Sequence, residues 1–292
     1  MGQTFFGGGH GGNSYVFTAP GQSGPKLGLY DEESTQTSSI GQRLEFEDGR
    51  AFRYGHFVAA VNRGVLVSQD VSVTVVSSID GKFTDSAGTA KDDYATTDTV
   101  IFLTDTATFT TADAANVYAG GYLQITDAAG EGYNYRIKAN KIGTAAGLME
   151  LELFNALAGA LDSESSCSII GNMWRNLRIA TDGGGNDTLV SGVSARTMTA
   201  AYFGWAQTWG IANVLCVETA TVGVVGAGSI AVLSDTTNGA VETLGGGYSQ
   251  ASEALITSDF DFTPIITEPI VGYFADDAAT GEHVPVYLQI QP

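Results

Sequence analysis

The sequence predicts a mainly β protein with β-sandwich or barrel-like domains, an extended N-terminal arm and little helix. Short apolar segments with a period of two residues recur along the chain, and turns rich in Gly, Asp and Asn separate them. The 292 residues include 38 glycines, and only 15 % are charged, below the roughly 25 % typical of soluble domains. Stretches rich in Glu, Lys, Arg and Leu, which usually build surface helices, are missing.

Composition changes along the chain predict three parts. Residues 1–42 are rich in Gly with scattered aromatic side chains, and we expect an extended arm that becomes ordered on a neighbouring subunit. A floppy terminus is the alternative interpretation. Residues 43–180 are predicted to form a β-rich domain with a flexible loop near residues 80–99, and residues 181–292 a C-terminal β domain. Hydrophobic residues make up 43 % of the chain, which is enough for a sizeable core.

Two turns predict hairpins within this pattern. Residues 47–50, Glu-Asp-Gly-Arg, separate two apolar strand-like segments, and Asn238-Gly239 separates two more. Residues 155–161 are expected to form a short helix or turn. Further strands are predicted from the alternation of side chains at residues 64–67, 71–75, 100–103, 121–126, 133–139, 148–154, 167–171, 212–218, 229–233, 240–243, 265–274 and 284–290.

The net charge of the chain limits the classes of molecule that it is expected to bind. Thirteen Lys and Arg stand against 32 Asp and Glu, a net charge of −19. Such a field repels nucleic-acid phosphates and anionic membranes, so we expect no direct binding to either. It favours docking on a protein surface with basic patches, although a marine or halophilic habit would give the same composition.

Few patterns of residues in the sequence could support catalysis or metal binding. The histidines His10, His56 and His283 are too scattered to predict a metal site, and no G-x-S-x-G nucleophile motif is present. Residues 223–228 contain three glycines, but a strand-like segment follows them where a nucleotide-binding loop needs a helix. Solvated turns are the preferred interpretation of the acidic pairs, which leave an interface cation open: Asp92 with Asp93, Asp259 with Asp261, and Asp276 with Asp277. We therefore expect no catalytic residue, no cofactor and no metal.

The two cysteines, Cys167 and Cys216, lie in apolar strand-like segments, and we expect buried thiols rather than a disulfide or a metal site. The first residues, MGQTFFGGGHGG, show neither the basic nor the apolar region of a secretory signal. No apolar run approaches the roughly 20 residues of a membrane span. We expect the protein to be made in a cytoplasm.

Aromatic residues are the best candidates for contacts. In the arm, the candidates for contact with another subunit are Phe5, Phe6, Tyr15, Phe17 and Tyr30. A second group is expected to form either core or interface, with three of the four on one face of a strand: Tyr202, Phe203, Trp205 and Trp209.

Several motifs follow one another in a characteristic order. They are the GRAFRY of residues 49–54, the AGGYLQI of 119–125, the GEGYNYRI of 130–137, the YFGWAQTWG of 202–210, the hairpin of 234–241 and the IVGY of 270–273. This succession resembles virion structural proteins of tailed bacteriophages, particularly marine ones, encoded near the major capsid protein. Among these it is most similar to head decoration, or cement, proteins.

The resemblance implies a non-enzymatic subunit that binds the outer surface of the major capsid protein lattice and stabilises the head. It also implies contacts between neighbouring copies, a homotrimer, and a location on the capsid surface of the virion after synthesis in the host cytoplasm. A tail, neck or fibre component is one alternative. A carbohydrate-binding β protein is another.

Overall fold

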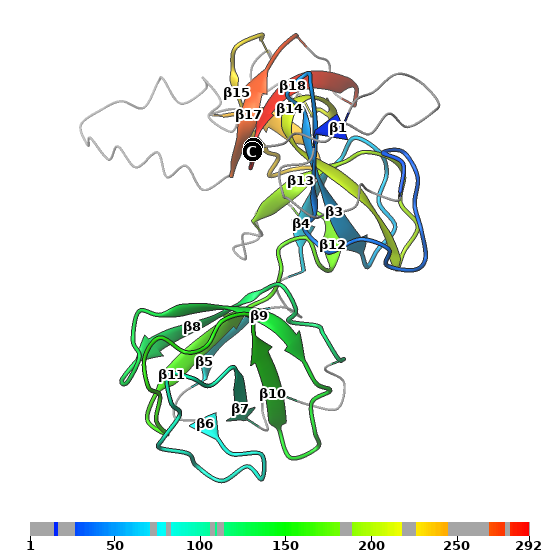
Figure 1. The fold of residues 1–292 in the computed structure, drawn as a ribbon. Coiled ribbons are helices and arrows are strands. Elements are labelled where there is room, and N and C mark those ends of the chain that lie inside the picture. The colour runs from blue at the N-terminus through cyan, green and yellow to red at the C-terminus, as the bar shows by residue number, and fades with distance from the viewer. Residues whose placement is uncertain are drawn as a thin grey trace, which may run out of the picture. The chain divides into compact units, whose positions relative to one another are not determined.

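A computed structural model describes residues 27–70, 83–105, 109, 114–181, 189–217, 226–244, 269–277 and 281–291, and the backbone alone of residues 15–16 and 75–79. Every regular element in these residues is a β-strand (Figure 1). The mainly β class is therefore confirmed. Residues 155–161, where a helix or turn was expected, form an irregular turn whose Leu157 and Leu161 are buried.

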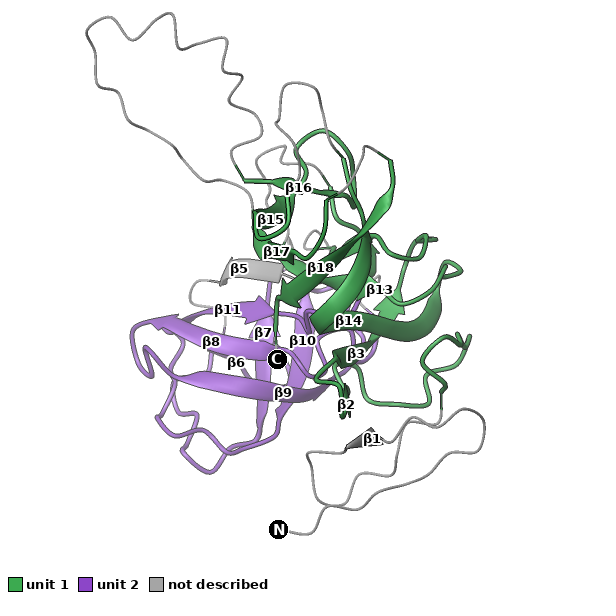
Figure 2. Cartoon of the chain, turned by 90° about the horizontal axis from the view of Figure 1, so that it is seen from above, with its two compact units in different colours: residues 1–70, 176–292 green, residues 71–175 purple. Residues whose placement is uncertain are grey.

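The strands form two compact units, coloured separately in Figure 2. Unit 1 combines residues 1–70 with residues 176–292, and unit 2 is residues 71–175. Unit 2 is thus inserted into the sequence of unit 1. This division differs from the predicted boundary at residue 180, because strands on either side of the insertion pair with each other.

Five strands of unit 1 close a mixed barrel. They are β3 (Ala51–Phe57), β12 (Leu177–Ile179), β4 (Leu66–Gln69), β13 (Val190–Ser194) and β14 (Tyr202–Leu215). Each pairs with the next in this order, and β14 pairs with β3 to close the circle. Strand β12 runs parallel to β3 and antiparallel to β4. A buried cluster drawn from this region includes Phe57, Val67, Leu177, Met198 and Ala206.

A second sheet region extends from the far half of β14. Its order is β14, β18 (His283–Gln289), β17 (Ile270–Phe274), β15 (Ile230–Leu233) and β16 (Val241–Thr243). One face of this region is buried in an apolar cluster. At the other end of the sheet, β2 (Arg43–Phe46) pairs with β3, and β1 (Tyr15–Val16) pairs with β2.

Both predicted hairpins are confirmed. Strands β2 and β3 are antiparallel neighbours, and the turn between them has Gly49 at φ +84°. Strands β15 and β16 flank Asn238-Gly239, with Gly239 at φ +74°. Glycine accepts this left-handed conformation without the steric cost that a Cβ would bring, which is why these turns are readable from sequence.

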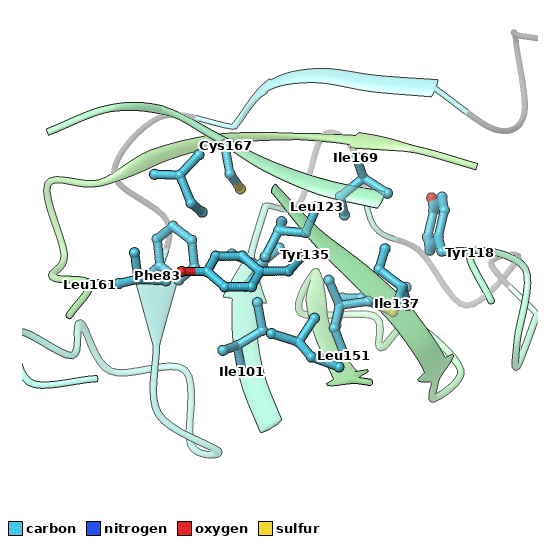
Figure 3. Close-up of a cluster of buried hydrophobic side chains, with 14 of the residues drawn as sticks. Phe83, Ile101, Tyr118, Leu123, Tyr135, Ile137, Leu151, Leu161, Cys167 and Ile169 are labelled. Carbon is cyan, nitrogen blue, oxygen red and sulfur yellow. The ribbon is translucent and has the colours of Figure 1, made fainter. Parts of the chain in front are cut away.

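Unit 2 is one antiparallel sheet wrapped around a single core (Figure 3). Side chains alternate between buried and exposed along its middle strands, as the period of two predicts. Its strand order is β5 (Val75–Ile79), β11 (Ser166–Ile170), β8 (Tyr122–Asp127), β9 (Asn134–Asn140), β10 (Leu148–Leu153), β7 (Val100–Thr104) and β6 (Phe83–Thr84).

Tyr94 attaches part of the predicted 80–99 loop to this core. Its hydroxyl donates to the carbonyl oxygen of Thr84 at 2.5 Å and accepts the backbone N–H of Phe102 at 2.8 Å. Its ring meets that of Phe83 edge to face, with centroids 6.1 Å apart. The side chain is buried, and this burial raises the pKa of Tyr94 to about 12.

We expect alkaline pH to weaken unit 2 through Tyr94. A tyrosine whose pKa is higher in the folded state holds its proton more firmly there, so its stabilising effect is present below the unfolded pKa of about 10. That effect is lost as pH rises through the folded value. Urea unfolding between about pH 10 and 12 should show a steeper loss of free energy for the wild type than for Tyr94→Phe. Equal pH dependence in the two proteins would contradict this expectation.

Candidate functional site

A pocket of about 570 Å³ opens on unit 1 where two turns approach strand β14. The turn between β2 and β3 contributes Arg50, and the turn before β4 contributes Arg63 and Gly64. The floor and walls come from several strands and from one exposed tyrosine: Phe52, Val193, Ser194, Ala195, Gln207, Ile211, Ala212, Asn213, His283, Pro285 and Tyr30.

Gly64 allows its turn to lie directly against the sheet. Its N–H donates to the carbonyl oxygen of Ser194 at 3.0 Å, and its own carbonyl accepts the N–H of Leu215 at 2.7 Å. The backbone has φ +71°, and a Cβ at this position would lie 2.8 Å from the carbonyl oxygen of Asn213 and 2.6 Å from the His283 ring. Only glycine fits both the conformation and the space.

A β-bulge shapes the floor of the pocket. The register between β14 and β3 shifts between Gln207 and Trp209, and Gly210 has φ +82°. The side-chain amide of Gln207 donates to the carbonyl oxygens of Trp209 and Ile211 at 3.0 and 2.9 Å, which supports the irregular backbone. A Cβ on Gly210 would lie 3.1 Å from the Cα of Arg50, so the bulge brings the hairpin turn close to β14.

The pocket is basic although the chain is acidic. Arg50 pairs with Asp48 at 2.7 Å, and its guanidinium lies over the rings of Phe46 and Phe52, 5.1 and 5.8 Å from their centroids. Burial alone would raise the pKa of Asp48, but hydrogen bonds from Arg50 outweigh it and lower that pKa. Arg63 is exposed. No Asp or Glu among the described residues lines the pocket.

Next to the pocket, apolar side chains form a row across four strands, the cross-strand row. Direct register pairs connect Ile211 of β14 to Tyr287 of β18, Tyr287 to Tyr273 of β17, and Tyr273 to Ile230 of β15. Directly opposed residues project from the same face of a sheet. Ile211, Tyr287 and Tyr273 are 48, 40 and 42 % exposed, so this face is a nearly continuous apolar surface.

The four aromatic residues predicted to form core or interface lie in different parts of unit 1. Trp205 is fully buried, and its indole N–H donates to the carbonyl oxygen of Leu27 at 3.3 Å. The ring of Tyr54 stacks on Phe203, with centroids 5.9 Å apart, and meets Trp205 edge to face at 5.5 Å. Tyr202 is half-buried beside the barrel cluster.

Trp209 lies apart from Phe203 and Trp205, although a strict period of two predicted one shared face. The bulge between Gln207 and Trp209 interrupts the alternation. The Trp209 ring instead meets Tyr287 edge to face, with centroids 6.3 Å apart. Trp209 therefore adds a half-buried indole to the cross-strand row.

Most of the predicted contact residues of the arm lie outside the described residues: Phe5, Phe6 and Phe17. The backbone of Tyr15 lies in β1, opposite Phe46 of β2. Tyr30 is 64 % exposed and stands at the edge of the pocket. Among the contact candidates whose side chains the structure describes, Tyr30 lines the candidate site.

Both cysteines are buried and neither forms a disulfide, as expected. His56 contacts the ring of Phe203, His283 lies in the pocket wall, and His10 is outside the described residues. The described residues contain no group of three or more His, Cys, Asp or Glu side chains placed to hold a metal ion. The strand expected after the glycines of residues 223–228 is β15.

Comparisons with protein-family models, with curated proteins and with solved structures find no match for this chain. Within the part of the chain that the structure describes, no helix is long and apolar enough to cross a membrane. The residues of the pocket and of the cross-strand row are therefore the features that bear on function. Sequence reasoning missed the pocket, and its only local indication was Gly64 inside an apolar segment.

We expect Gly64→Ala to destabilise unit 1 and distort the pocket. Its cost combines a left-handed alanine with overlap against fixed backbone, about 2 to 4 kcal/mol in free energy of unfolding. Gly228→Ala is the matched control, because Gly228 has φ +88° but no atom within 4 Å of a Cβ. Urea denaturation should show a clearly larger loss for Gly64→Ala. Equal losses would mean that close packing at Gly64 is unimportant.

Proposed function

We propose that this chain is a non-enzymatic structural protein of a virion, and specifically a decoration protein that binds the outer surface of the major capsid protein lattice and stabilises the head. The observation that carries the proposal is the cross-strand row, an exposed apolar surface on a rigid sheet. The order of sequence motifs supports the assignment to a virion.

The row has the composition of a protein-binding surface. Tyr and Trp are enriched at interface hot spots, since each offers a large apolar area together with one polar group. Tyr273 and Tyr287 are register partners, and Trp209 packs against Tyr287. Because neighbouring strands hold all three residues, little conformational entropy is lost when a partner covers them.

The edge of the sheet offers a second means of attachment. Residues 15–16 add a short antiparallel strand to β2, with Tyr15 opposite Phe46 and Val16 opposite Glu45. An exposed strand edge accepts any extended segment through main-chain hydrogen bonds. In an assembly, the arm of one copy would pair in the same way with β2 of its neighbour. This exchange would connect copies into the proposed homotrimer.

The charge supports an outer location. A net charge of −19 opposes contact with packaged nucleic acid and with anionic membranes, and it favours basic patches on a shell exterior. Many copies on one lattice bind multivalently, so modest individual contacts give firm retention.

Immunogold electron microscopy tests the proposed location. Antibodies raised against the purified chain should label the heads of virions that contain it, at many sites per particle. Labels confined to tails or necks would favour the alternative virion component. Particles that carry no label, while the chain is present in infected cells, would contradict a virion role.

Replacing Tyr273 and Tyr287 together by Ser should weaken attachment to heads. Removing two hot-spot aromatic side chains costs at least about 2 kcal/mol of binding free energy, roughly a thirtyfold weaker Kd. Cosedimentation of the purified variant with heads that lack the chain measures this. Tyr122→Ser is the matched control, because Tyr122 is equally exposed, at 45 %, but lies in unit 2. Undiminished cosedimentation of a folded double variant would exclude the row as the contact.

A further inference from the structure

We propose that the pocket of unit 1 is a binding site for a carboxylate carried on an apolar group. This inference goes beyond the proposed virion function and does not depend on it. The geometry that points to it is a single pocket lined by two arginines from separate turns and by apolar side chains of β3, β14 and β18.

The charge distribution is the first argument. Acidic residues outnumber basic ones by 32 to 13 in the chain, yet the described lining of the pocket includes Arg50, Arg63 and His283 and no carboxylate. Two arginines in the lining of one pocket, in so acidic a chain, concentrate positive potential where a ligand would enter. An anion is the ligand that such a site attracts.

Arg63 is the principal candidate for contact with the ligand. Its backbone N–H donates to the hydroxyl of Thr197 at 3.4 Å, and Nε2 of His283 lies 3.4 Å from its carbonyl oxygen. The next residue, Gly64, is held against the sheet as described above. Among the described residues no ion pair involves the Arg63 guanidinium. A guanidinium on an anchored backbone presents a planar fork that matches the two oxygens of a carboxylate.

Arg50 is oriented but already partly neutralised. Asp48 holds its Nε at 2.7 Å, and the rings of Phe46 and Phe52 support its guanidinium plane. Asp48 offsets one positive charge, so the two arginines together offer about one net charge to a ligand. This balance suits a singly charged carboxylate better than a doubly charged phosphate.

The rest of the pocket lining favours a ligand that carries an apolar group. The side-chain amide of Gln207 donates to two backbone carbonyls, and the hydroxyl of Ser194 donates to the carbonyl oxygen of Asn62 at 2.5 Å. These donors are therefore engaged within the protein. Apolar side chains make up much of the remaining wall: Phe52, Val193, Ile211, Ala212 and Pro285. The volume of about 570 Å³ is in the range of small-molecule pockets.

Isothermal titration of the full chain with 3-phenylpropionate tests the proposal. The neutral 3-phenylpropanamide and the doubly charged phenyl phosphate are the matched probes. We expect saturable binding of the acid, and at least about tenfold weaker binding of both matched probes. Absence of saturable binding of the acid up to about 10 mM, or equal binding of acid and amide, would overturn the proposal.

The Arg63→Gln variant tests whether the acid binds in this pocket. This variant should weaken binding of the acid by about tenfold or more, whereas Arg136→Gln, on an exposed arginine of unit 2 that lies over Phe154, should leave it unchanged. Thermal melting should show that Arg63→Gln folds, since no ion pair is lost. Unchanged affinity in a folded Arg63→Gln variant would overturn the assignment. If that variant does not fold, the comparison of acid with amide binding to the wild type still tests whether the protein recognises the carboxylate.

A short amidated peptide with Glu between two Phe residues, and its Gln counterpart, distinguish the source of the carboxylate. Binding that depends on Glu supports the proposal and indicates an acidic side chain of another protein segment. Binding of 3-phenylpropionate without binding of either peptide also supports it and indicates a free small-molecule acid. Equal binding of the Glu and Gln peptides would contradict recognition of the carboxylate.

Discussion

Strand β14 is the element on which the rest of unit 1 depends. One edge of its fourteen residues pairs with β13, and the other edge pairs first with β3 over Tyr202–Trp209 and then with β18 over Trp209–Leu215. The near half closes the barrel, and the far half carries the sheet that contains the cross-strand row. Because one strand serves both purposes, a change in its register would alter barrel, pocket and row together.

The bulge at Gln207–Trp209 separates the two roles of this strand. Before it, Trp205 is buried, and its indole N–H donates to the carbonyl oxygen of Leu27. After it, Ile211 is half-exposed and takes part in both the row and the pocket wall. The left-handed backbone at Gly210 and the hydrogen bonds of Gln207 stabilise the irregularity. Bulges often redirect side chains in this way, and here the redirection produces an apolar surface beside a basic pocket.

The acidic charge, the apolar row and the basic pocket are physically compatible within one protein. Net negative charge opposes the self-association that exposed tyrosines would otherwise favour. The pocket shares Ile211 with the row, so a partner that covers the row would approach Arg63 as well. A carboxylate on that partner would then meet the arginine, although a free acid would satisfy the same chemistry.

Local features of the sequence determined the β class, the alternation of buried side chains and the two hairpins, because the left-handed Gly49 and Gly239 act over a few residues. Strand β12 is only three residues long and β13 has few large apolar side chains, so neither shows a period of two. Their pairing with β3 and β4 spans the whole of unit 2, and only the tertiary structure revealed the insertion. The pocket likewise combines residues from turns and strands that are far apart in the chain. The bulge that separates Trp209 from Trp205 cannot be recognised in the sequence, because the residue pattern shows no break there. Contacts between segments far apart in the chain decided these features, since no local pattern of residues encodes which distant strand will become a neighbour.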